Sequence, residues 1–299
     1  MEEKTSRPAR FTAIAAVAVT AVLLFAPLPA GGLGIWQGQI LDFGHVPLFA
    51  VLVVALRAGM GPPLYRPLGA ALALAGIAEV IQPFVGRTGD WLDLLRGALG
   101  AFSAAAAIRA WESRRTRLQA LAFLVLAVAL PLGPIAEAAP YVMDTLESQR
   151  AFPVLATFST DRELLRWERS QATLSRSSDG GHVDFLTGPG EYPGVALRPG
   201  VGNFSGYRWL CYEFRVVGAP VALATSVRTG TGAPDRTAHA DVQQQYASGS
   251  HVARLDLEQL AAQGRPERLD LSDVRAVILF MVRPQQPRTI VLTRVWLEP

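Results

Sequence analysis

The stretch FTAIAAVAVTAVLLFAPL at residues 11–28 has no charged side chain, and it determines how the first half of the chain is interpreted. A helix needs about 20 mostly apolar residues to cross a bilayer. Four further apolar segments follow at 46–60, 68–84, 92–110 and 118–139. The sequence therefore predicts an α-helical transmembrane bundle of about five spans in residues 1–139, with the lipid bilayer as its partner.

The positive charges between these segments predict an orientation. The tail at 1–10 carries three, the connection after the second segment two and the connection after the fourth four, whereas the opposite side carries only Arg87. Cytoplasmic connections carry the excess of lysine and arginine. We therefore expect a multi-pass protein with a cytoplasmic N-terminus and an extracytoplasmic C-terminal domain.

The first segment has a second interpretation as a cleaved signal peptide, because small residues follow it at 29–32. Glu2 and Glu3 in front of the segment, and its length, favour a retained helix. Either alternative leaves the C-terminal domain outside the cytoplasm.

Charge and cysteine content exclude several classes of function. The net charge of +3 is spread along the chain without a basic stripe, which excludes nucleic acid as a partner. Cys211 is the sole cysteine, so an intrachain disulfide and a cysteine metal cluster are excluded. The four histidines lack metal-ligand spacing, and the sequence predicts no metal and no cofactor.

Polar side chains collect at one predicted membrane boundary, the outer one. Ionisable residues at membrane depth cost several kcal/mol unless they are paired or hydrated, so they indicate function. The alternative is that they are hydrated helix ends. Within this set, Glu79 with His45 or Asp93 is the candidate catalytic acid–base pair. The predicted membrane cluster consists of Asp42, His45, Glu79, Gln82, Arg87, Asp90 and Asp93.

These residues also occur in a motif pattern that resembles the VanZ-like membrane family. The family pattern has three parts: Asp-x-x-His, Glu-x-x-Gln, and Arg followed by Asp-x-x-x-Asn-x-x-Gly. Residues 35–110 contain matching segments, which are DFGH at 42–45, EVIQ at 79–82, RTGD at 87–90 and DLLRGALG at 93–100. The family's asparagine falls on Gly97, which is a departure from the pattern. The resemblance implies a bacterial plasma (inner) membrane and an association with glycopeptide-antibiotic resistance, but no established reaction.

The second half of the chain has a different pattern. Residues 140–156 are predicted to be a linker, with a short amphipathic helix on the membrane surface at 144–150 as the alternative. Residues 157–299 are predicted to be an all-β jelly-roll sandwich. Short segments alternate apolar and polar residues, as at 212–216, and Gly, Pro, Asn and Asp separate them. Eight or more such strands with little helix are typical of a sandwich or jelly roll. We expect Trp167, Trp209 and Trp296 in its core.

This half resembles the galactose-binding-like jelly rolls, which include carbohydrate-binding modules. The resemblance depends on Phe158 with Trp167, YPGV at 192–195, FSGY at 204–207, Arg228 and the ends at 277–280 and 289–297. It implies a glycan site, where aromatic rings stack on sugar faces and polar groups bind hydroxyls. The alternative is core aromatics and solvated loops. The candidate ligand residues are Tyr192, Arg228, Asp235, His239 and Tyr246.

Two functions remain open from the sequence. No G-x-S-x-G, H-E-x-x-H or P-loop motif is present. We therefore favour a non-enzymatic envelope protein whose outer domain binds an envelope glycan or a protein partner. The alternative is a membrane enzyme or transporter that acts on a lipid-linked or envelope substrate through Glu79, His45 and Asp93.

Overall fold

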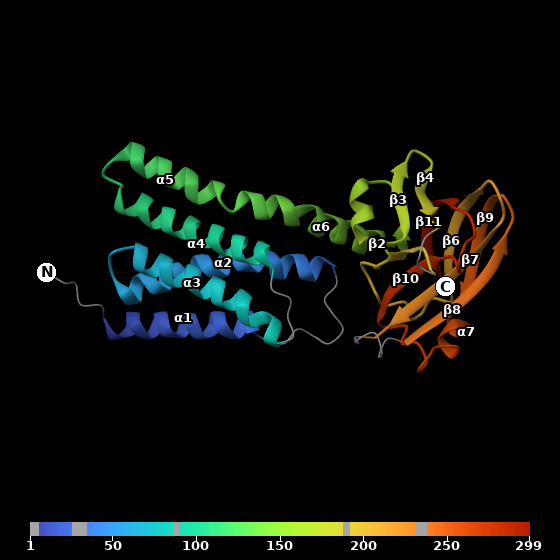
Figure 1. Cartoon of the computed structure of the whole chain (residues 1–299), viewed down its shortest axis with the longest axis horizontal. Helices are drawn as coiled ribbons and strands as arrows, with labels where there is room; N and C mark the ends of the chain where they lie inside the picture. The colour runs from blue at the N-terminus through green and yellow to red at the C-terminus, as the bar shows by residue number, and fades with distance from the viewer. Residues whose placement is uncertain (1–5, 26–34, 86–89, 188–191, 231–237) are drawn as a thin grey trace. The chain divides into compact units, whose positions relative to one another are not determined.

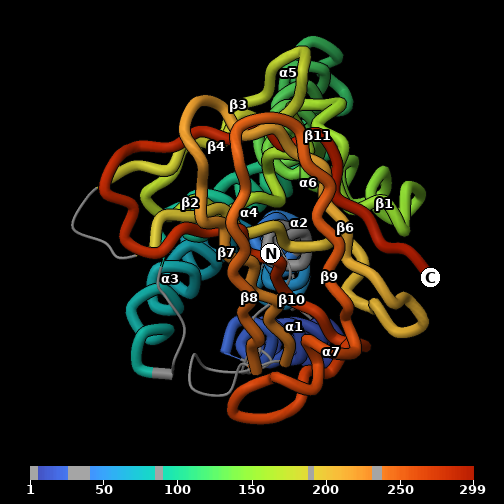
Figure 2. The backbone as a smooth tube through the Cα atoms, turned by 90° about the vertical axis from the view of Figure 1, so that its right-hand side faces the viewer, coloured from blue at the N-terminus to red at the C-terminus, as the bar shows by residue number. Residues whose placement is uncertain are grey.

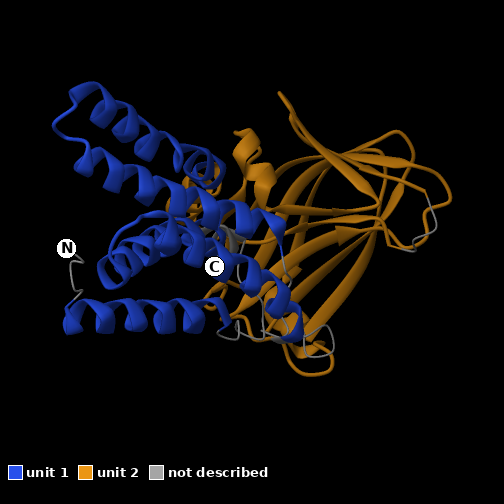
Figure 3. Ribbon diagram, turned by 60° about the vertical axis from the view of Figure 1, so that its left-hand side comes forward, with its two compact units in different colours: residues 1–28, 37–139 blue, residues 29–36, 140–299 orange. Residues whose placement is uncertain are grey.

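A computed structural model of the chain describes residues 6–25, 35–85, 90–187, 192–230 and 238–299 (Figure 1). The chain divides into two compact units (Figure 3). The first comprises residues 1–28 and 37–139, and the second residues 29–36 and 140–299. The first is helical and the second is dominated by antiparallel strands.

The helical unit is built from long apolar helices. They are α1 (Arg7–Phe25), α2 (Ile35–Met60), α3 (Tyr65–Ile81), the 3-10 turn Gln82–Val85, α4 (Trp91–Glu112), α5 (Arg117–Ala129) and the start of α6 (Leu132–Ala151). Within the described ranges, five helical stretches have the length and composition to cross a membrane: Arg7–Phe25, Leu41–Met60, Tyr65–Phe84, Trp91–Glu112 and Arg117–Ala151.

Small residues allow the helices of this unit to pack closely. A Cβ at Gly100 of α4 would lie 2.0 Å from the carbonyl oxygen of Val46 in α2, so only glycine fits there. A Cβ at Gly97 would lie 2.9 Å from Cδ2 of Phe49. The buried Phe49 side chain therefore takes the space that an asparagine at position 97 would need.

The segment 140–156, predicted as a linker or as a short helix at 144–150, is mostly regular secondary structure. Helix α6 (Leu132–Ala151) continues through most of it, and β1 (Val154–Ala156) pairs with β11 of the sandwich. Buried polar contacts hold the end of α6: Asp144 Oδ2 lies 2.7 Å from Arg166 Nε. The apolar segment expected at 118–139 is also divided, because α5 ends at Ala129 and α6 starts at Leu132.

The second unit is a sandwich of two antiparallel sheets, whose backbone can be followed in Figure 2. The six-stranded sheet has the order β3 (Ala172–Ser177), β4 (Gly180–Phe185), β11 (Arg288–Glu298), β6 (Trp209–Val217), β9 (Gly249–Asp256), with β1 also on β11. The five-stranded sheet has the order β2 (Trp167–Ser170), β5 (Gly194–Leu197), β10 (Val274–Phe280), β7 (Val221–Thr229), β8 (Ala238–Tyr246). A short 3-10 helix at Asp161–Arg166 and α7 (Leu257–Ala262) complete the unit.

The strand order is that of a jelly roll. Strands β4, β11, β6 and β9 lie in one sheet, and β5, β10, β7 and β8 lie in the same relative order in the other. Successive strands in the sequence therefore wind between the two sheets as two Greek keys. This confirms the predicted helical region followed by a jelly-roll sandwich.

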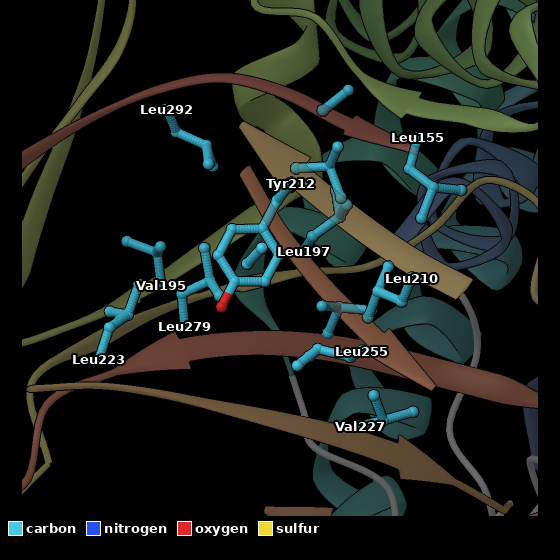
Figure 4. Close-up of a cluster of buried hydrophobic side chains, with 14 of the residues drawn as sticks. Leu155, Val195, Leu197, Leu210, Tyr212, Leu223, Val227, Leu255, Leu279 and Leu292 are labelled. Atoms are coloured by element: carbon cyan, nitrogen blue, oxygen red, sulfur yellow. The ribbon is translucent and has the colours of Figure 1, made fainter. Parts of the chain in front are cut away.

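The two inner faces form one apolar core (Figure 4). Along β6, Leu210, Tyr212 and Phe214 point into the core while Glu213 and Arg215 point out, as the two-residue period of a strand requires. The hydroxyl of Tyr212 pairs with Thr225 Oγ1 at 2.8 Å. Burial raises the pKa of Tyr212 well above its usual value.

The three strand tryptophans differ in position. Trp167 is buried in the core, as expected. Trp209 and Trp296 are only half-buried, on the outer face of the six-stranded sheet, which contradicts the prediction. The guanidinium of Arg208 lies over the Trp209 ring at 5.0 Å, and that of Arg294 over the Trp296 ring at 4.9 Å. Stacked arginines thus shield these rings in place of a core.

Candidate functional site

A groove with a volume of about 820 Å³ runs across the outer face of the five-stranded sheet. All five strands of this sheet contribute to it. At the usual 4.7–4.9 Å strand spacing, five strands span about 19 Å, which suits an extended ligand. The residues lining the groove are Glu168, Arg169, Ser170, Tyr192, Gly194, Val195, Ala196, Ala224, Ser226, Arg228, His239, Asp241, Val242, Gln243, Ile278, Phe280 and Val282.

The strand register places two rows of side chains on the floor of the groove, and several of them are small. Residues directly opposite each other on neighbouring strands share one face of a sheet. Two adjacent rows cross the sheet in this way: Ser170, Gly194, Phe280, Ala224, Gln243 and, next to it, Glu168, Ala196, Ile278, Ser226, Asp241. A Cβ at Gly194 would lie 2.6 Å from the Cβ of Phe280, so this part of the floor requires glycine.

An aromatic pair forms one end of the groove. The rings of Tyr192 and Phe280 are 6.0 Å apart at an interplanar angle of 73°. Tyr192 is 54% exposed even though it is one of the largest side chains in the groove. Edge contact with Phe280 orients the tyrosine ring and leaves its other surface accessible. An exposed, oriented ring of this kind is suited to stacking on a flat apolar ligand face.

Unpaired polar side chains lie in the same groove. Arg228 is opposite His239 in the β7–β8 pair, and Ser226 is opposite Asp241. Among the residues that the structure describes, the side chains of Arg228, His239 and Asp241 make no hydrogen bond and no ion pair. By contrast, the groove carboxylate Glu168 is bound by Arg198 Nε at 2.6 Å. Three polar groups are therefore available to a ligand.

The ligand residues expected from the sequence separate into three groups. The structure places Tyr192, Arg228 and His239 in the groove. Tyr246 lies on the other face of β8, because it is an odd number of residues from His239. Its ring packs on Phe214 at 4.8 Å and on His251 at 5.2 Å, and it is not a groove residue. Asp235 lies outside the described residues.

The candidate ligand residues from the sequence did not include Asp241, although it lies in the same polar stretch as His239, or Phe280. The available signal was period-2 alternation: Asp241 is two residues from His239, and therefore shares its face. Phe280 required knowledge of the pairing between β10 and β5, which the sequence alone does not supply.

A second polar group lies within the helical unit and is organised by Arg96. Its Nη1 lies 2.9 Å from Asp93 Oδ1 and 3.8 Å from Asp42 Oδ2. Its Nη2 lies 2.9 Å from Glu137 Oε1. The guanidinium is buried and bound by carboxylates from α2, α4 and α6, so its charge is well neutralised.

Two side chains of this group are buried without a complete set of partners. His45 Nδ1 lies 3.2 Å from the Asp42 carbonyl oxygen and 3.8 Å from Asp93 Oδ1. In the described part of the chain, His45 Nε2 and both polar atoms of the Gln82 side chain have no hydrogen-bond partner. Buried polar atoms normally form hydrogen bonds, so the side chains of His45 and Gln82 can each still bind another polar group.

The membrane cluster expected from the sequence is only partly assembled around Arg96. Asp42, His45 and Asp93 are brought together. Glu79 instead accepts a hydrogen bond from the Asp90 amide at 2.7 Å, and Asp90 caps α4 through the Leu92 amide.

Arg87 lies outside the described residues. Arg96 and Glu137 were not expected members, because an arginine and a glutamate 41 positions apart show no sequence signal of their contact. No group of three or more His, Cys, Asp or Glu side chains in the described ranges could hold a metal ion.

Comparison with known proteins gives no match to a protein family and no match among curated proteins. Solved structures align with about half of the chain. One is a family 11 carbohydrate-binding module from Clostridium thermocellum, in complex with a β-1,3-1,4-mixed-linked tetrasaccharide, at 15% identity and a TM-score of 0.40, covering 48% of this chain and 94% of the module.

An agarase aligns at 12% identity and a TM-score of 0.40, over 49% of this chain and 24% of the enzyme. A family 30 carbohydrate-binding module from Clostridium thermocellum aligns at 9% identity and a TM-score of 0.32, over 44% of this chain and 88% of the module. The chain thus spans about a quarter of the agarase. At these TM-scores we draw no functional conclusion from the similarities.

Proposed function

We propose that this chain is a multi-pass membrane protein whose extracytoplasmic jelly roll binds a cell-envelope glycan without catalysis. The observation that carries this proposal is the groove on the five-stranded sheet, where the exposed Tyr192 ring lies across from the unpaired Arg228, His239 and Asp241. Sugar rings present apolar C–H faces and rims of hydroxyl groups. A ring platform beside unpaired polar groups matches both features.

The size and floor of the groove support the same function. A volume of about 820 Å³ lies within the 300–1,000 Å³ that is usual for ligand sites. Small side chains, among them Gly194, Ala196 and Ala224, leave room above the sheet for a chain of sugar rings. Ser226 lies opposite Asp241 in the groove, but among the described residues no hydrogen bond joins its hydroxyl to Asp241 or His239, so we assign the groove to binding.

The membrane placement is supported by the outer surface of the helical unit. Large apolar side chains are more than half exposed on it, which is unfavourable in water by about 25 cal/mol per Å². Examples are Phe11, Ile14, Val51, Val80 and Leu121. Lipid tails would cover this surface, and the loop charges orient the N-terminus toward the cytoplasm. Alkaline phosphatase fused after Pro299 should be active, and an inactive fusion would contradict the orientation.

Glycan binding is tested with the full-length protein in lipid nanodiscs. It would be titrated against fluorescent peptidoglycan fragments and other envelope polysaccharides. We expect saturable binding that Tyr192→Ala weakens by tenfold or more, while Arg215→Met leaves it unchanged because Arg215 lies on the other sheet with Asp179. Absence of binding to every polysaccharide by a folded protein would reject the glycan-binding function.

A second candidate function is supported by the unfilled hydrogen-bonding capacity of His45 and Gln82 in the helical unit. In this alternative, the VanZ-like region handles a lipid-linked or envelope substrate, and its loss changes glycopeptide tolerance. Glu79→Gln should then raise glycopeptide susceptibility of the producing cell, whereas Glu112→Gln, which removes a carboxylate that pairs with Arg57, should not. Equal susceptibility of both variants and the parent would reject it.

A further inference from the structure

A second hollow of about 650 Å³ adjoins the groove at its polar end. His239 and Asp241 line both hollows, so the two are continuous around strand β8, which is the edge of its sheet. The backbones of His239 and Arg265 exchange two hydrogen bonds of 2.9 Å, which hold the segment at 264–265 beside this edge. The Arg265 residue lines the second hollow.

Arginine pairing differs sharply between this region and the rest of the jelly roll. Eight exposed or half-buried arginines of the jelly roll form ion pairs with carboxylates: Arg162, Arg176, Arg198, Arg208, Arg215, Arg254, Arg268 and Arg275. In the described residues from 154 to 298, only Arg169, Arg228 and Arg265 lack an ion pair, a side-chain hydrogen bond and a ring contact. All three line the groove or the adjoining hollow.

The free charges of the two hollows are therefore mostly positive. Glu168 is neutralised by Arg198, so Asp241 is the carboxylate of the two hollows that has no partner among the described residues. A guanidinium binds a carboxylate, sulfate or phosphate group through two parallel hydrogen bonds. The Asp241 carboxylate suits hydroxyl groups of the same ligand, because it accepts hydrogen bonds.

We infer that the ligand of the groove is an acidic glycan, whose anionic groups bind Arg228 and Arg265 while Asp241 accepts hydrogen bonds from its hydroxyls. The inference depends on the proposed glycan-binding function and adds the chemical class of the glycan. Arg228 and Arg265 lie on either side of the shared His239, so an extended chain that passes around β8 meets both. A neutral glycan would leave both guanidinium groups without a partner.

The experiment uses the full-length protein in phosphatidylcholine nanodiscs and three pairs of polysaccharides that differ in charge. They are polygalacturonate and its methyl ester, dextran sulfate and dextran, and a phosphorylated mannan and its phosphatase-treated form. We expect the acidic member of at least one pair to bind tenfold tighter, with the preference decreasing at high salt. Arg228→Met and Arg265→Met should each reduce that binding about tenfold.

The controls separate this inference from the general function. Arg215→Met removes a positive charge that is paired with Asp179 on the opposite sheet, and it should leave binding unchanged. If it weakens acidic binding as much as Arg228→Met does, attraction is non-specific and the inference is wrong. Equal binding of both members of every pair, dependent on Tyr192, would overturn the acidic class and leave glycan binding intact. Absence of all binding would reject both.

Discussion

The outer faces of the two sheets of the jelly roll differ in how many of their charged side chains form ion pairs. On the six-stranded sheet, Arg215 and His182 both bind Asp179, at 2.7 and 2.8 Å. Asp184 on the same face accepts hydrogen bonds from two threonine hydroxyls. On the five-stranded sheet, Arg228 and Asp241 lie on neighbouring strands, yet neither has a side-chain partner among the residues that the structure describes. The first face carries a paired cluster around Asp179, whereas the second carries charges that have no partner among the described residues.

This difference indicates that paired charges on one face stabilise the fold, whereas unpaired charges on the other face are available for binding. Polar groups that are satisfied by neighbours contribute to the folded state, and the cost of removing one depends on its burial. Polar groups that are left free contribute little to folding, but they are available to a ligand. Substitutions on the paired side should therefore change unfolding, and substitutions in the groove should change binding only.

The largest effect on stability is expected at Glu163, the carboxylate that accepts the most hydrogen bonds among the described residues of the jelly roll. It is buried and accepts hydrogen bonds from the amides of Thr157, Phe158 and Ser159 at 2.7–2.9 Å. Glu163→Gln removes the charge that these donors face, and we expect the unfolding free energy to fall by about 2–4 kcal/mol. Denaturant unfolding measures it. Glu168→Gln, at an exposed ion pair, should cost less than about 0.5 kcal/mol.

The same carboxylate predicts how stability depends on pH. Burial alone would raise the pKa of Glu163, but the hydrogen bonds from Thr157, Ser159 and Phe158 outweigh it and hold the pKa below the usual value. The unfolded chain therefore binds a proton at higher pH than the folded chain does. Its stabilisation is complete above pH of about 4.3, the ordinary glutamate pKa, and is lost as pH falls toward the folded value. Acid unfolding of Glu163→Gln should show a smaller slope in this range.

Particular residues show which features of the fold could be predicted from the sequence. Period-2 alternation in strands such as 212–216 was sufficient to predict a sandwich, because side-chain direction on a strand follows from position alone. The same periodicity failed for Trp296, because a register shift between Leu292 and Arg294 changes which residues of β11 point outward. The groove also required long-range pairing: Tyr192 meets Phe280 across 88 positions. Arg96 and its partner Glu137, 41 positions apart, were missed for the same reason.

A smaller effect is expected at Tyr192, and it should appear in binding and not in stability. Its ring is 54% exposed and contacts Phe280 only at an edge. Tyr192→Ala should reduce glycan affinity tenfold or more, which is about 1.4 kcal/mol or more. Its unfolding free energy should change by less than about 0.5 kcal/mol. Isothermal titration and denaturant unfolding of one preparation measure both, and a loss of stability as large as that of Glu163→Gln would contradict the separation.

The smallest effect is expected at Arg215, and it distinguishes a paired charge from a free one on otherwise similar strands. Its guanidinium is half-exposed and shares Asp179 with His182, so the histidine still binds the carboxylate after substitution. Arg215→Met should lower the unfolding free energy by about 0–1 kcal/mol, as for other surface ion pairs, and this loss should shrink at high salt. Arg228→Met should leave the unfolding free energy unchanged at any salt concentration, because it breaks no pair. If the two variants lose equal stability at low salt, Arg228 has a partner in solution and the two faces of the jelly roll are not distinguished by charge pairing.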